Sequence, residues 1–295
     1  MKRDFLQLSD LSLEEHRSIL ERADALKSRR HEGRVETTLL GRCLALVFEK
    51  PSTRTRLSFE AAMVQLGGNA MVLPHSESQM SRGEPLADTA RVVSRYVDAI
   101  VLRTSSDERL REFAKAATVP VINGLTDVGH PVQVLADLFT IQERLGAVKG
   151  KTVAFVGDGL SNMARSFAEA ARLFEFTLRI ASPAGFAPSG ALADPALAVA
   201  GANVVVTDVW TSMGQEAEAE ARRRAFRGFC VDEALVARAA PDAIVLHCLP
   251  AHRGEEITEA VLEGPRSAVW DEAENRLHVQ KALLELLIPQ GVARP

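Results

Sequence analysis

Short, uninterrupted apolar runs alternate with helical segments along the whole 295-residue chain. The runs show no polar alternation, which is typical of strands that are buried on both faces. We expect strands at 43–48, 70–73, 99–102, 119–122, 152–156, 177–181, 204–207 and 244–246. Strands that alternate with helices form parallel sheets through right-handed crossovers. The pattern therefore predicts an α/β fold with two doubly wound parallel-sheet domains linked by long helices.

The expected helices lie between these strands, and the first begins with a capping box because Glu15 follows Ser12 by three residues. We expect further helices at 56–66, 85–96, 107–117, 131–145, 162–174, 216–227 and 279–287. A chain of this length typically forms two domains. We therefore place a first domain at 1–145 and a second at 146–276. The C-terminal helix, about 277–295, is expected to pack back on the first domain.

Charge and cysteine content exclude several classes of protein. The chain has 35 basic and 39 acidic side chains, a net charge of -4, whereas nucleic-acid-coating proteins are usually clearly basic. Its three cysteines form no CxxC pair, which argues against a disulfide scaffold and favours a reducing compartment. No signal peptide and no run of ~20 apolar residues is visible. We expect a cytoplasmic protein with small-molecule partners, no nucleic acid and no membrane.

Ligands in open α/β sheets lie outside the carboxyl ends of the strands, where this chain places several polar clusters. After strand 43–48, Ser52, Thr53 and Thr55 supply hydroxyls, and Arg54 supplies a planar fork of donors at a helix N-terminus. These are the parts of a phosphate cradle, although no Walker loop is present. The alternative is a capped helix with solvated arginines. Arg103 follows the expected strand 99–102. Taken by itself, an arginine at this position is more typical of a surface residue than of a ligand.

Two further strand ends carry a histidine and a glycine-rich turn. His130 lies immediately before helix 131–145, whose dipole disfavours the imidazolium form. A neutral histidine there can donate one hydrogen bond to a carbonyl oxygen, and a capping or core histidine is the alternative. Gly157 and Gly159 resemble the start of a dinucleotide fingerprint, but Asn162 stands where the third glycine belongs. This motif therefore predicts a binding turn and does not favour an NAD site.

The last strand ends carry an acid and a thiol. Asp208 is suited to binding an amine, with an N-cap aspartate as the alternative. Cys248 follows an apolar strand, where a buried inert cysteine is usual. His247 and His252 suggest a metal, but no complementary ligand set is apparent. The segment 216–227 pairs acidic and basic residues four positions apart, which predicts a solvated helix.

The order of the motifs is more specific than any one of them. Ser-Thr-Arg-Thr-Arg at 52–56, His-Pro-x-Gln at 130–133, Asp-x-x-x-Ser-Met-Gly at 208–214 and His-Cys-Leu-Pro at 247–250 resemble the aspartate/ornithine carbamoyltransferase family over nearly the whole chain. The resemblance implies carbamoyl transfer from carbamoyl phosphate to L-ornithine, giving citrulline and phosphate in arginine metabolism. It implies no metal and no organic cofactor. Within the family, the Ser-Met-Gly segment and Cys248 favour ornithine over aspartate, putrescine and N-acetylornithine.

The resemblance also implies a role for each residue. The expected catalytic residues are Arg103, His130, Asp208 and Cys248. The expected carbamoyl phosphate ligands are Ser52, Thr53, Arg54, Thr55, Gln79, Arg103, His130, Gln133, Cys248, Leu249 and Arg276. The expected ornithine ligands are Asn162, Asp208, Ser212 and Met213. Gln79 would reach into a neighbouring subunit's site, so a homotrimer or a multiple of trimers is expected.

Two other function classes compete with this one. The Gly157–Gly159 turn suggests a nucleotide-linked oxidoreductase, and a non-catalytic family member acting as a regulatory or scaffold subunit is the second alternative. The segment 183–194 is short compared with the family pattern. We therefore expect the second sheet to be smaller or to have a trimmed edge, without loss of the named ligands.

Overall fold

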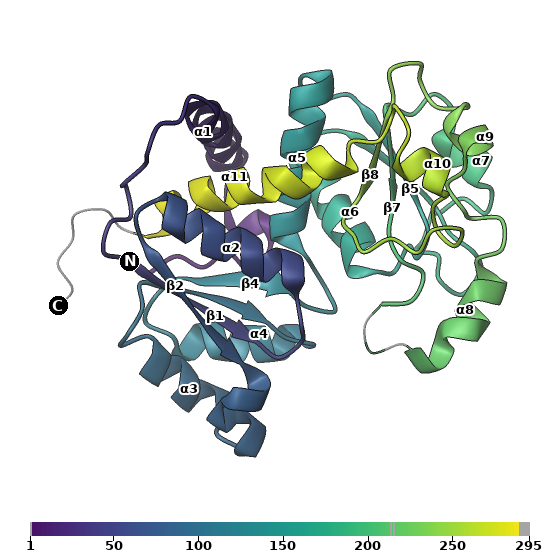
Figure 1. Cartoon of the computed structure of the whole chain (residues 1–295). Coiled ribbons are helices and arrows are strands. Elements are labelled where there is room, and N and C mark those ends of the chain that lie inside the picture. Colours follow the sequence, from purple (N-terminus) through teal and green to yellow (C-terminus); the bar gives the residue numbers. More distant parts are fainter. Residues whose placement is uncertain (1, 213, 215, 289–295) are drawn as a thin grey trace. The chain divides into compact units, whose positions relative to one another are not determined.

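The computed structural model describes residues 2–212, 214 and 216–288, which fold as two α/β units (Figure 1). One unit comprises the residues up to Leu135 and those from Glu274 onward, and the other comprises Ala136–Ala273. Both divisions fall inside helices, α5 (Pro131–Leu145) and α11 (Val269–Leu287). Two parallel-sheet domains linked by long helices are thus confirmed. The sequence-based domain bounds at 145/146 and 276/277 stay a prediction.

Each unit contains one sheet of four parallel strands, and the two sheets have the same strand order. The first sheet, β2-β1-β3-β4, consists of β1 (Cys43–Phe48), β2 (Asn69–Pro74), β3 (Ala99–Arg103) and β4 (Val121–Leu125). The second, β6-β5-β7-β8, consists of β5 (Thr152–Val156), β6 (Thr177–Ala181), β7 (Val204–Thr207) and β8 (Ile244–His247). The order reverses between β1 and β3 and between β5 and β7, which is where such sheets bind ligands.

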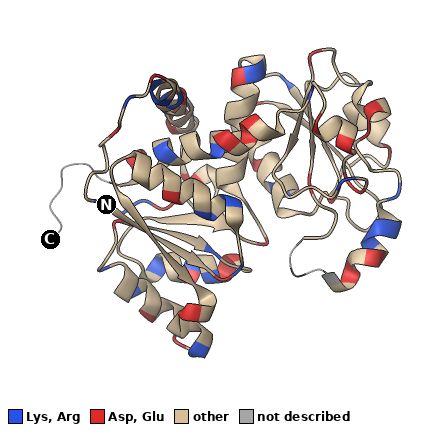
Figure 2. Ribbon diagram, in the orientation of Figure 1, with Lys and Arg blue, Asp and Glu red and all other residues tan. Residues whose placement is uncertain are grey.

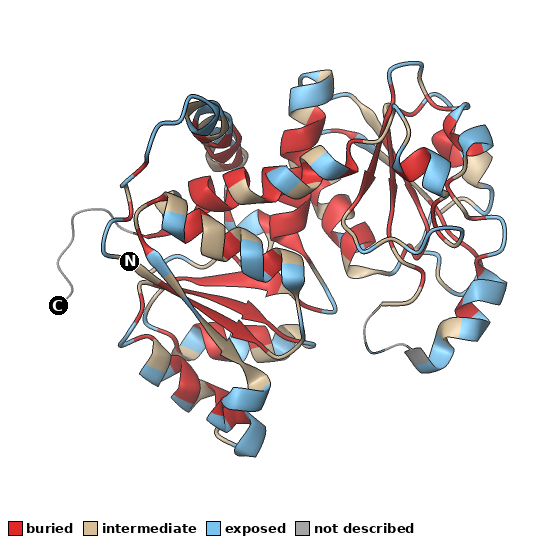
Figure 3. Cartoon of the chain, in the orientation of Figure 1, coloured by how far each residue is buried: buried red, intermediate tan, exposed pale blue. Residues whose placement is uncertain are grey.

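The strands of each sheet differ in how far they are buried (Figure 3). The strands β3, β7 and β8 are buried at every residue, and their sequences are almost entirely apolar. The edge strands β2 and β6 are mostly half-buried or exposed, whereas β4 and β8, at the opposite edges, are buried except for Leu125. The apolar runs that predicted the strands are therefore explained by helices and loops that cover both faces of each sheet.

The helices of the first unit are η1 (Leu8–Asp10), α1 (Leu13–His31), α2 (Thr53–Gln65), η2 (His75–Glu77), η3 (Gln79–Arg82), α3 (Leu86–Val93) and α4 (Asp107–Ala116). Those of the second are α6 (Asn162–Phe174), α7 (Pro195–Val199), η4 (Glu216–Glu218), α8 (Ala219–Ala225), α9 (Glu233–Val236) and α10 (Glu259–Leu262). The capping box of α1 is confirmed: the Ser12 hydroxyl accepts from the Glu15 N–H at 3.2 Å, and the Glu15 carboxylate accepts from the Ser12 N–H at 2.9 Å. No helix in the described ranges combines the length and the apolar character needed to cross a membrane.

Two helical segments differ in part from the expectations. The last helix begins at Val269 and not at 279, since the polar run that resembles a loop forms its first turns, with Glu272, Asn275 and Arg276 buried. The segment 216–227 is largely exposed and forms the expected pairs Glu218–Arg222 and Glu220–Arg224, but the Arg222 side chain is buried within α8. Both differences have the same cause. The local sequence pattern of a charged residue is typical of a solvated position, but these side chains have partners in distant parts of the chain.

The short segment 183–194 leaves the edge of the second sheet at β6. Beyond this strand the sheet continues only as an isolated parallel bridge between Ala181 and Leu192. The Leu192 N–H donates to the Ile180 carbonyl at 2.8 Å, and the Ser182 N–H donates to the Leu192 carbonyl at 3.0 Å. One loop therefore returns along this edge, and the trimming of the edge relative to the family pattern stays a prediction.

Candidate active site

In the first unit, a buried polar cluster forms at the carboxyl ends of β1, β3 and β4. Thr55 lies in the first turn of α2, and Gln133 lies in the first turn of α5. Arg276 of α11 joins them: its Nη2 donates to the Thr55 hydroxyl at 2.8 Å, and its Nη1 donates to the Gln133 side-chain oxygen. All three side chains are buried. The structure therefore brings together residues that are far apart in sequence and that the family resemblance alone had grouped.

His130 lies beside this cluster, immediately before α5, and only 5% of its surface is exposed. Burial lowers the pKa of the imidazole well below its ordinary value of 6.5, and the positive charges of Arg276, Arg103 and Arg54 lower it further. The direction of this shift agrees with the neutral His130 that the helix dipole predicts, and burial is its largest cause.

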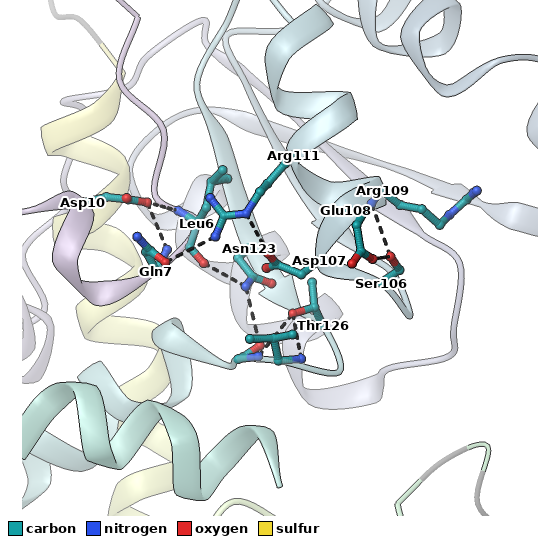
Figure 4. A network of polar contacts seen from close by, with 12 residues as sticks. Leu6, Gln7, Asp10, Ser106, Asp107, Glu108, Arg109, Arg111, Asn123 and Thr126 are labelled. Carbon is teal, nitrogen blue, oxygen red and sulfur yellow. Dashed lines mark hydrogen bonds and ion pairs between the residues drawn. The ribbon is translucent and has the colours of Figure 1, made fainter. Parts of the chain in front are cut away.

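The loop that delivers His130 is held by side chains that the sequence analysis missed (Figure 4). The Asn123 amide of β4 donates to the Leu6 carbonyl at 2.9 Å and to the Gly129 carbonyl at 3.5 Å. The Thr126 hydroxyl accepts from the Gly129 N–H at 3.2 Å. The only local signal was a polar residue inside an apolar strand, whose partners near the N-terminus could not be read from the sequence.

A second brace holds the segment between β1 and α2. The Glu49 carboxylate accepts hydrogen bonds from Thr104 and from the Arg109 guanidinium, and the Glu49 N–H donates to the Arg103 carbonyl at 2.9 Å. Burial by itself raises the pKa of Glu49, but the bonds from Arg109 and Thr104 outweigh it and hold that pKa below its ordinary value. The loop that carries the expected phosphate ligands is thus tied to the end of β3.

The remaining expected carbamoyl phosphate ligands of this unit differ in their exposure to solvent. Ser52 precedes α2, and its hydroxyl does not cap the helix. Thr53 is exposed and Arg54 is half-buried at the start of the same helix. Arg103, the last residue of β3, is buried. Gln79 is exposed on η3, which follows the edge strand β2, so the structure does not bring it into the buried cluster of this unit.

In the second unit, an acid and a thiol meet at the ends of β7 and β8. The Cys248 thiol donates to Asp208 Oδ1 at 3.2 Å, and the same oxygen accepts from the Val209 N–H at 2.8 Å. Burial raises the pKa of Asp208 above its ordinary value. Burial, and then the negative charge of Asp208, raise the pKa of Cys248 well above its ordinary value. Cys248 is therefore a neutral thiol and a hydrogen-bond donor.

The other residues expected to bind ornithine lie on two loops of the same unit. Asn162 is the first residue of α6, whose N-cap is Ser161: the Ser161 hydroxyl accepts from the Ala164 N–H at 3.2 Å. Ser212 is half-buried in the segment that follows β7. Met213 lies outside the described residues.

Behind Cys248 lies a buried network that the sequence did not indicate. The Leu249 N–H donates to His247 Nδ1 at 2.8 Å, so this nitrogen carries no proton and His247 Nε2 is the protonated one. Nε2 in turn donates to the buried Glu256 carboxylate at 3.0 Å. The His247 N–H donates to Glu272 at 2.8 Å. Leu249 has a left-handed backbone with φ of 56° and is half-buried. These bonds fix the turn that presents Cys248.

Within the described residues, two groups of side chains place potential metal ligands close together, although the sequence shows no complementary ligand set. Asp208, His247 and Cys248 place one potential ligand atom each within 4.8 Å of one another, and so do His252, Glu255 and Glu256. In the first group both nitrogens of His247 are already engaged by protein groups. The expectation that the protein needs no metal stays a prediction.

The glycine-rich turn after β5 serves loop packing. A Cβ atom on Gly159 would lie 2.5 Å from Pro188 Cδ and 3.2 Å from the Phe186 carbonyl oxygen, both in the loop that follows β6. The space that the second glycine of a dinucleotide fingerprint leaves for a pyrophosphate is therefore filled by this loop. This packing supports the view that the turn is not an NAD site.

Comparisons with known proteins agree with this division into two clusters. Two family models match: aspartate/ornithine carbamoyltransferase, carbamoyl-P binding domain, at residues 3–143, and aspartate/ornithine carbamoyltransferase, Asp/Orn binding domain, at residues 149–287. The ornithine carbamoyltransferase of Sorangium cellulosum (strain So ce56) is 56% identical over 306 residues, covering 97% of this chain and 98% of that protein.

Solved structures give the same result. The ornithine carbamoyltransferase from Pyrococcus furiosus aligns with a TM-score of 0.93 at 49% identity, covering 99% of this chain and 98% of that one. The anabolic ornithine carbamoyltransferase from Campylobacter jejuni aligns with a TM-score of 0.90 at 41% identity, covering 97% and 99%. With both models matched over nearly its full length and both strand-end clusters inside the matched ranges, the chain belongs to the aspartate/ornithine carbamoyltransferase family.

Proposed function

We propose that this chain transfers the carbamoyl group of carbamoyl phosphate to the δ-amine of L-ornithine, forming L-citrulline and phosphate. The observation that carries the proposal is the neutral, buried His130 surrounded by the positive charges of Arg54, Arg103 and Arg276. A cationic cluster suits a dianionic phosphate, while a neutral imidazole can still donate a hydrogen bond to a carbonyl oxygen. The names of the similar proteins supply the acceptor, ornithine.

Carbamoyl phosphate is assigned to the first unit. Its phosphate is held by the hydroxyls and N–H groups at the start of α2 and by two guanidinium groups, namely Ser52, Thr53, Arg54, Thr55 and Arg103. Thr55, Arg103 and His130 surround the carbonyl oxygen. The Gln133 oxygen, which accepts from Arg276, has a second lone pair that can accept from the carbamoyl NH₂ group.

The chemistry needs little more than positioned donors, because carbamoyl phosphate is already activated. The deprotonated δ-amine attacks the carbonyl carbon, and negative charge grows on the carbonyl oxygen. Donors aimed at that oxygen stabilise the transition state, and removal of one such donor typically costs about 2.7–4 kcal/mol. The C–O bond to phosphate then breaks, and phosphate leaves toward the arginines and can take the proton from the amine. No metal or organic cofactor is assigned to this step.

Ornithine is assigned to the second unit. Asp208, Asn162, Ser212 and Met213 bind its α-amino and α-carboxylate groups, and Cys248 with Leu249 lies near its side-chain amine. The raised pKa of the Cys248 thiol supports a role as a neutral hydrogen-bond donor, and not as a nucleophile. Since the two substrates are assigned to different units, turnover requires a step that brings the bound substrates into contact.

We also propose a homo-oligomer, a trimer or a multiple of trimers, in which Gln79 reaches a neighbouring subunit's site. Gln79 is exposed on η3. Leu57 and Val64 on α2 and Met71 on the edge strand β2 are also exposed, so the first unit carries apolar side chains that a second copy could cover.

Cytoplasmic location and a biosynthetic direction complete the proposal. Cys43, Cys230 and Cys248 are all free thiols, which is typical of a reducing compartment. The Campylobacter jejuni relative is described as anabolic, which favours arginine biosynthesis as the setting.

A colorimetric assay for the ureido product tests the function. Carbamoyl phosphate is incubated with the protein and with ornithine, putrescine, N-acetylornithine or aspartate in parallel. We expect ornithine to be the preferred acceptor; a preference for another amine, or no product with any of them, would contradict the proposal. A fluorescence titration with NADH tests the oxidoreductase alternative, and no binding is expected.

A further inference from the structure

Arg222 is a buried arginine on a helix that carries acidic and basic residues side by side (Figure 2). Its Nη1 donates to the Asp158 carboxylate at 2.8 Å and to the Trp210 carbonyl at 3.0 Å, and its Nε donates to Glu218 at 3.0 Å. The guanidinium carbon also lies 4.8 Å from the centre of the Phe186 ring. One side chain thus contacts three loops of the second unit.

Each of these loops follows a strand, and two of them lead to an expected ornithine ligand. Asp158 lies after β5, and its Oδ1 accepts from the Leu160 N–H at 2.9 Å, within the turn that leads to Asn162 at the start of α6. Trp210 lies after β7, between Asp208 and Ser212. Any shift of these two loops relative to each other would therefore separate side chains that are assigned to the same α-amino and α-carboxylate end of one substrate.

The third loop, after β6, closes the arrangement from the other side. Phe186 packs against Phe226, the residue that ends α8, with ring centres 4.8 Å apart, and Trp210 stacks on the same ring at 5.6 Å. The Gly159 N–H donates to the Ser182 hydroxyl, which donates to the Phe186 carbonyl. The guanidinium is therefore fixed on its charged edge by Asp158 and on its face by an aromatic ring.

The strength of the ion pair between Arg222 and Asp158 depends on its burial. Arg222 and Asp158 expose only 8% and 10% of their side chains, so the pair is weakly screened by solvent. The neighbouring pair Arg224–Glu220, two positions along the same helix, exposes 65% and 81%. An exposed pair of this kind contributes little, which makes Arg224 a matched control for Arg222.

We propose that Arg222 is a positioning residue for the amino-acid substrate. It holds the loops after β5, β6 and β7 in one arrangement, so that Asn162 and Asp208 face the same substrate molecule. This inference rests on the proposed function, because it assumes that the second unit binds ornithine. Carbamoyl phosphate, assigned to the first unit, is not positioned by Arg222.

The test compares Arg222→Lys and Arg222→Met with Arg224→Ala. Steady-state kinetics give KM for ornithine and kcat, and calorimetry gives the Kd of carbamoyl phosphate for the same preparations. We expect both Arg222 variants to raise KM for ornithine about tenfold or more, because misplaced binding groups cost up to about 10²-fold. The Kd of carbamoyl phosphate should stay at the wild-type value, and Arg224→Ala should match the wild type throughout.

A milder substitution tests the contact with the aromatic ring. The activity of the wild type distinguishes failure of the positioning role from failure of the proposed function. Phe186→Leu keeps an apolar side chain but removes the ring that contacts the guanidinium, and should raise KM for ornithine about threefold. Unchanged KM for ornithine in all three variants, or an equal loss of carbamoyl phosphate affinity, overturns the positioning role alone. A wild-type protein that forms no citrulline overturns the proposed function, and this inference with it.

Discussion

The first sheet, β2-β1-β3-β4, and the second, β6-β5-β7-β8, have the same strand order but carry opposite charge at their carboxyl ends. The first unit gathers Arg103, Arg276 and a neutral His130, whereas the second gathers Asp208 and a neutral thiol, Cys248. The comparison shows that a strand order determines where a ligand binds, while the residues after each strand determine which ligand it is. The chain's net charge of -4 conceals this separation.

The two units also differ in how their loops are braced. In the first, the Glu49–Arg109 pair is partly exposed, with 42% of the Arg109 side chain open to solvent. In the second, the Asp158–Arg222 pair is buried. We therefore expect that loss of the Glu49–Arg109 pair affects the segment between β1 and α2 only weakly. Loss of the Asp158–Arg222 pair should affect the loops after β5 and β7 more strongly.

The largest effect is expected for Arg54→Ala, which removes one cation from the first unit. Calorimetric binding of carbamoyl phosphate should be lost, and activity should fall on the order of 10²–10³-fold, as for the loss of one preorganised donor. The thermal midpoint should stay unchanged because Arg54 is only half-buried.

Arg56→Ala is the matched control for this change. Arg56 lies in the same turn of α2, but it pairs with Glu60 at 3.3 Å on an exposed face of the helix. Binding should therefore be retained. Tight carbamoyl phosphate binding by Arg54→Ala would contradict the proposal that the first unit binds this substrate through Arg54.

Cys248→Ala tests the second unit. Loss of the thiol leaves Asp208 Oδ1 with one donor fewer, and kcat/KM for ornithine should fall roughly tenfold, equivalent to about 1.4 kcal/mol. The free energy of unfolding, measured in urea, should change less than this. Cys43→Ala, in the first unit, serves as the control. Unchanged kinetics would make Cys248 a structural cysteine only.

The pH dependence of stability should have opposite sign in the two units. The pKa of His130 is lowered in the folded protein, so below about pH 6.5 the unfolded chain takes up a proton that the folded chain does not, and the free energy of unfolding falls. The pKa of Asp208 is raised, so the folded chain takes up the proton first, and the free energy of unfolding rises as pH falls through that pKa.

Urea unfolding of two variants between pH 7 and pH 4 measures these contributions. His130→Asn should flatten the decline of the unfolding free energy toward acid, whereas Asp208→Asn should steepen it. Each difference from the wild type is at most about 1.4 kcal/mol per pH unit. Slopes that match the wild type in both variants would show that neither group titrates differently on folding.

The smallest effect is expected for Arg109→Met, which removes the exposed brace of the first unit. The free energy of unfolding should fall by about 0.2–1 kcal/mol, as for other exposed ion pairs. KM for carbamoyl phosphate should change by less than about twofold, since Thr104 still binds Glu49. Arg111→Met, which breaks the exposed pair with Asp107, is the control. A loss of about 3 kcal/mol would mean that this brace behaves as a buried pair.

The bounds of strands and helices were predicted correctly where the pattern lies within the element's own residues. Strands β1, β5, β6 and β7 and helices α5 and α6 begin and end where their apolar runs and caps predicted. The capping box at Ser12 was also predicted correctly. The lowered pKa of His130 agrees in direction with the neutral form that the helix dipole predicts. Burial on both faces gives a strand a continuous apolar run, and this run can be read without knowing the strand's neighbours.

Charged residues with distant partners could not be assigned in this way. Arg222 was expected to be solvated, but it is buried and binds Asp158, which lies 64 residues away in the sequence. The polar start of α11 lies outside the helix that the sequence predicts, although its Glu272 and Arg276 are buried and hydrogen-bonded. A hydrophilic side chain has the same local pattern whether it is solvated or buried in an ion pair.

The sequence by itself determined the parallel α/β architecture, the strand ends that carry chemistry and, through the order of its motifs, the family. The tertiary structure decided which of the charged groups are buried, and therefore which pKa values shift and which ion pairs resist screening. The physical reason is that periodicity and motif spacing are properties of neighbouring residues. Desolvation and hydrogen bonding depend on which distant segments pack together, as Arg276 does with Thr55 and Gln133.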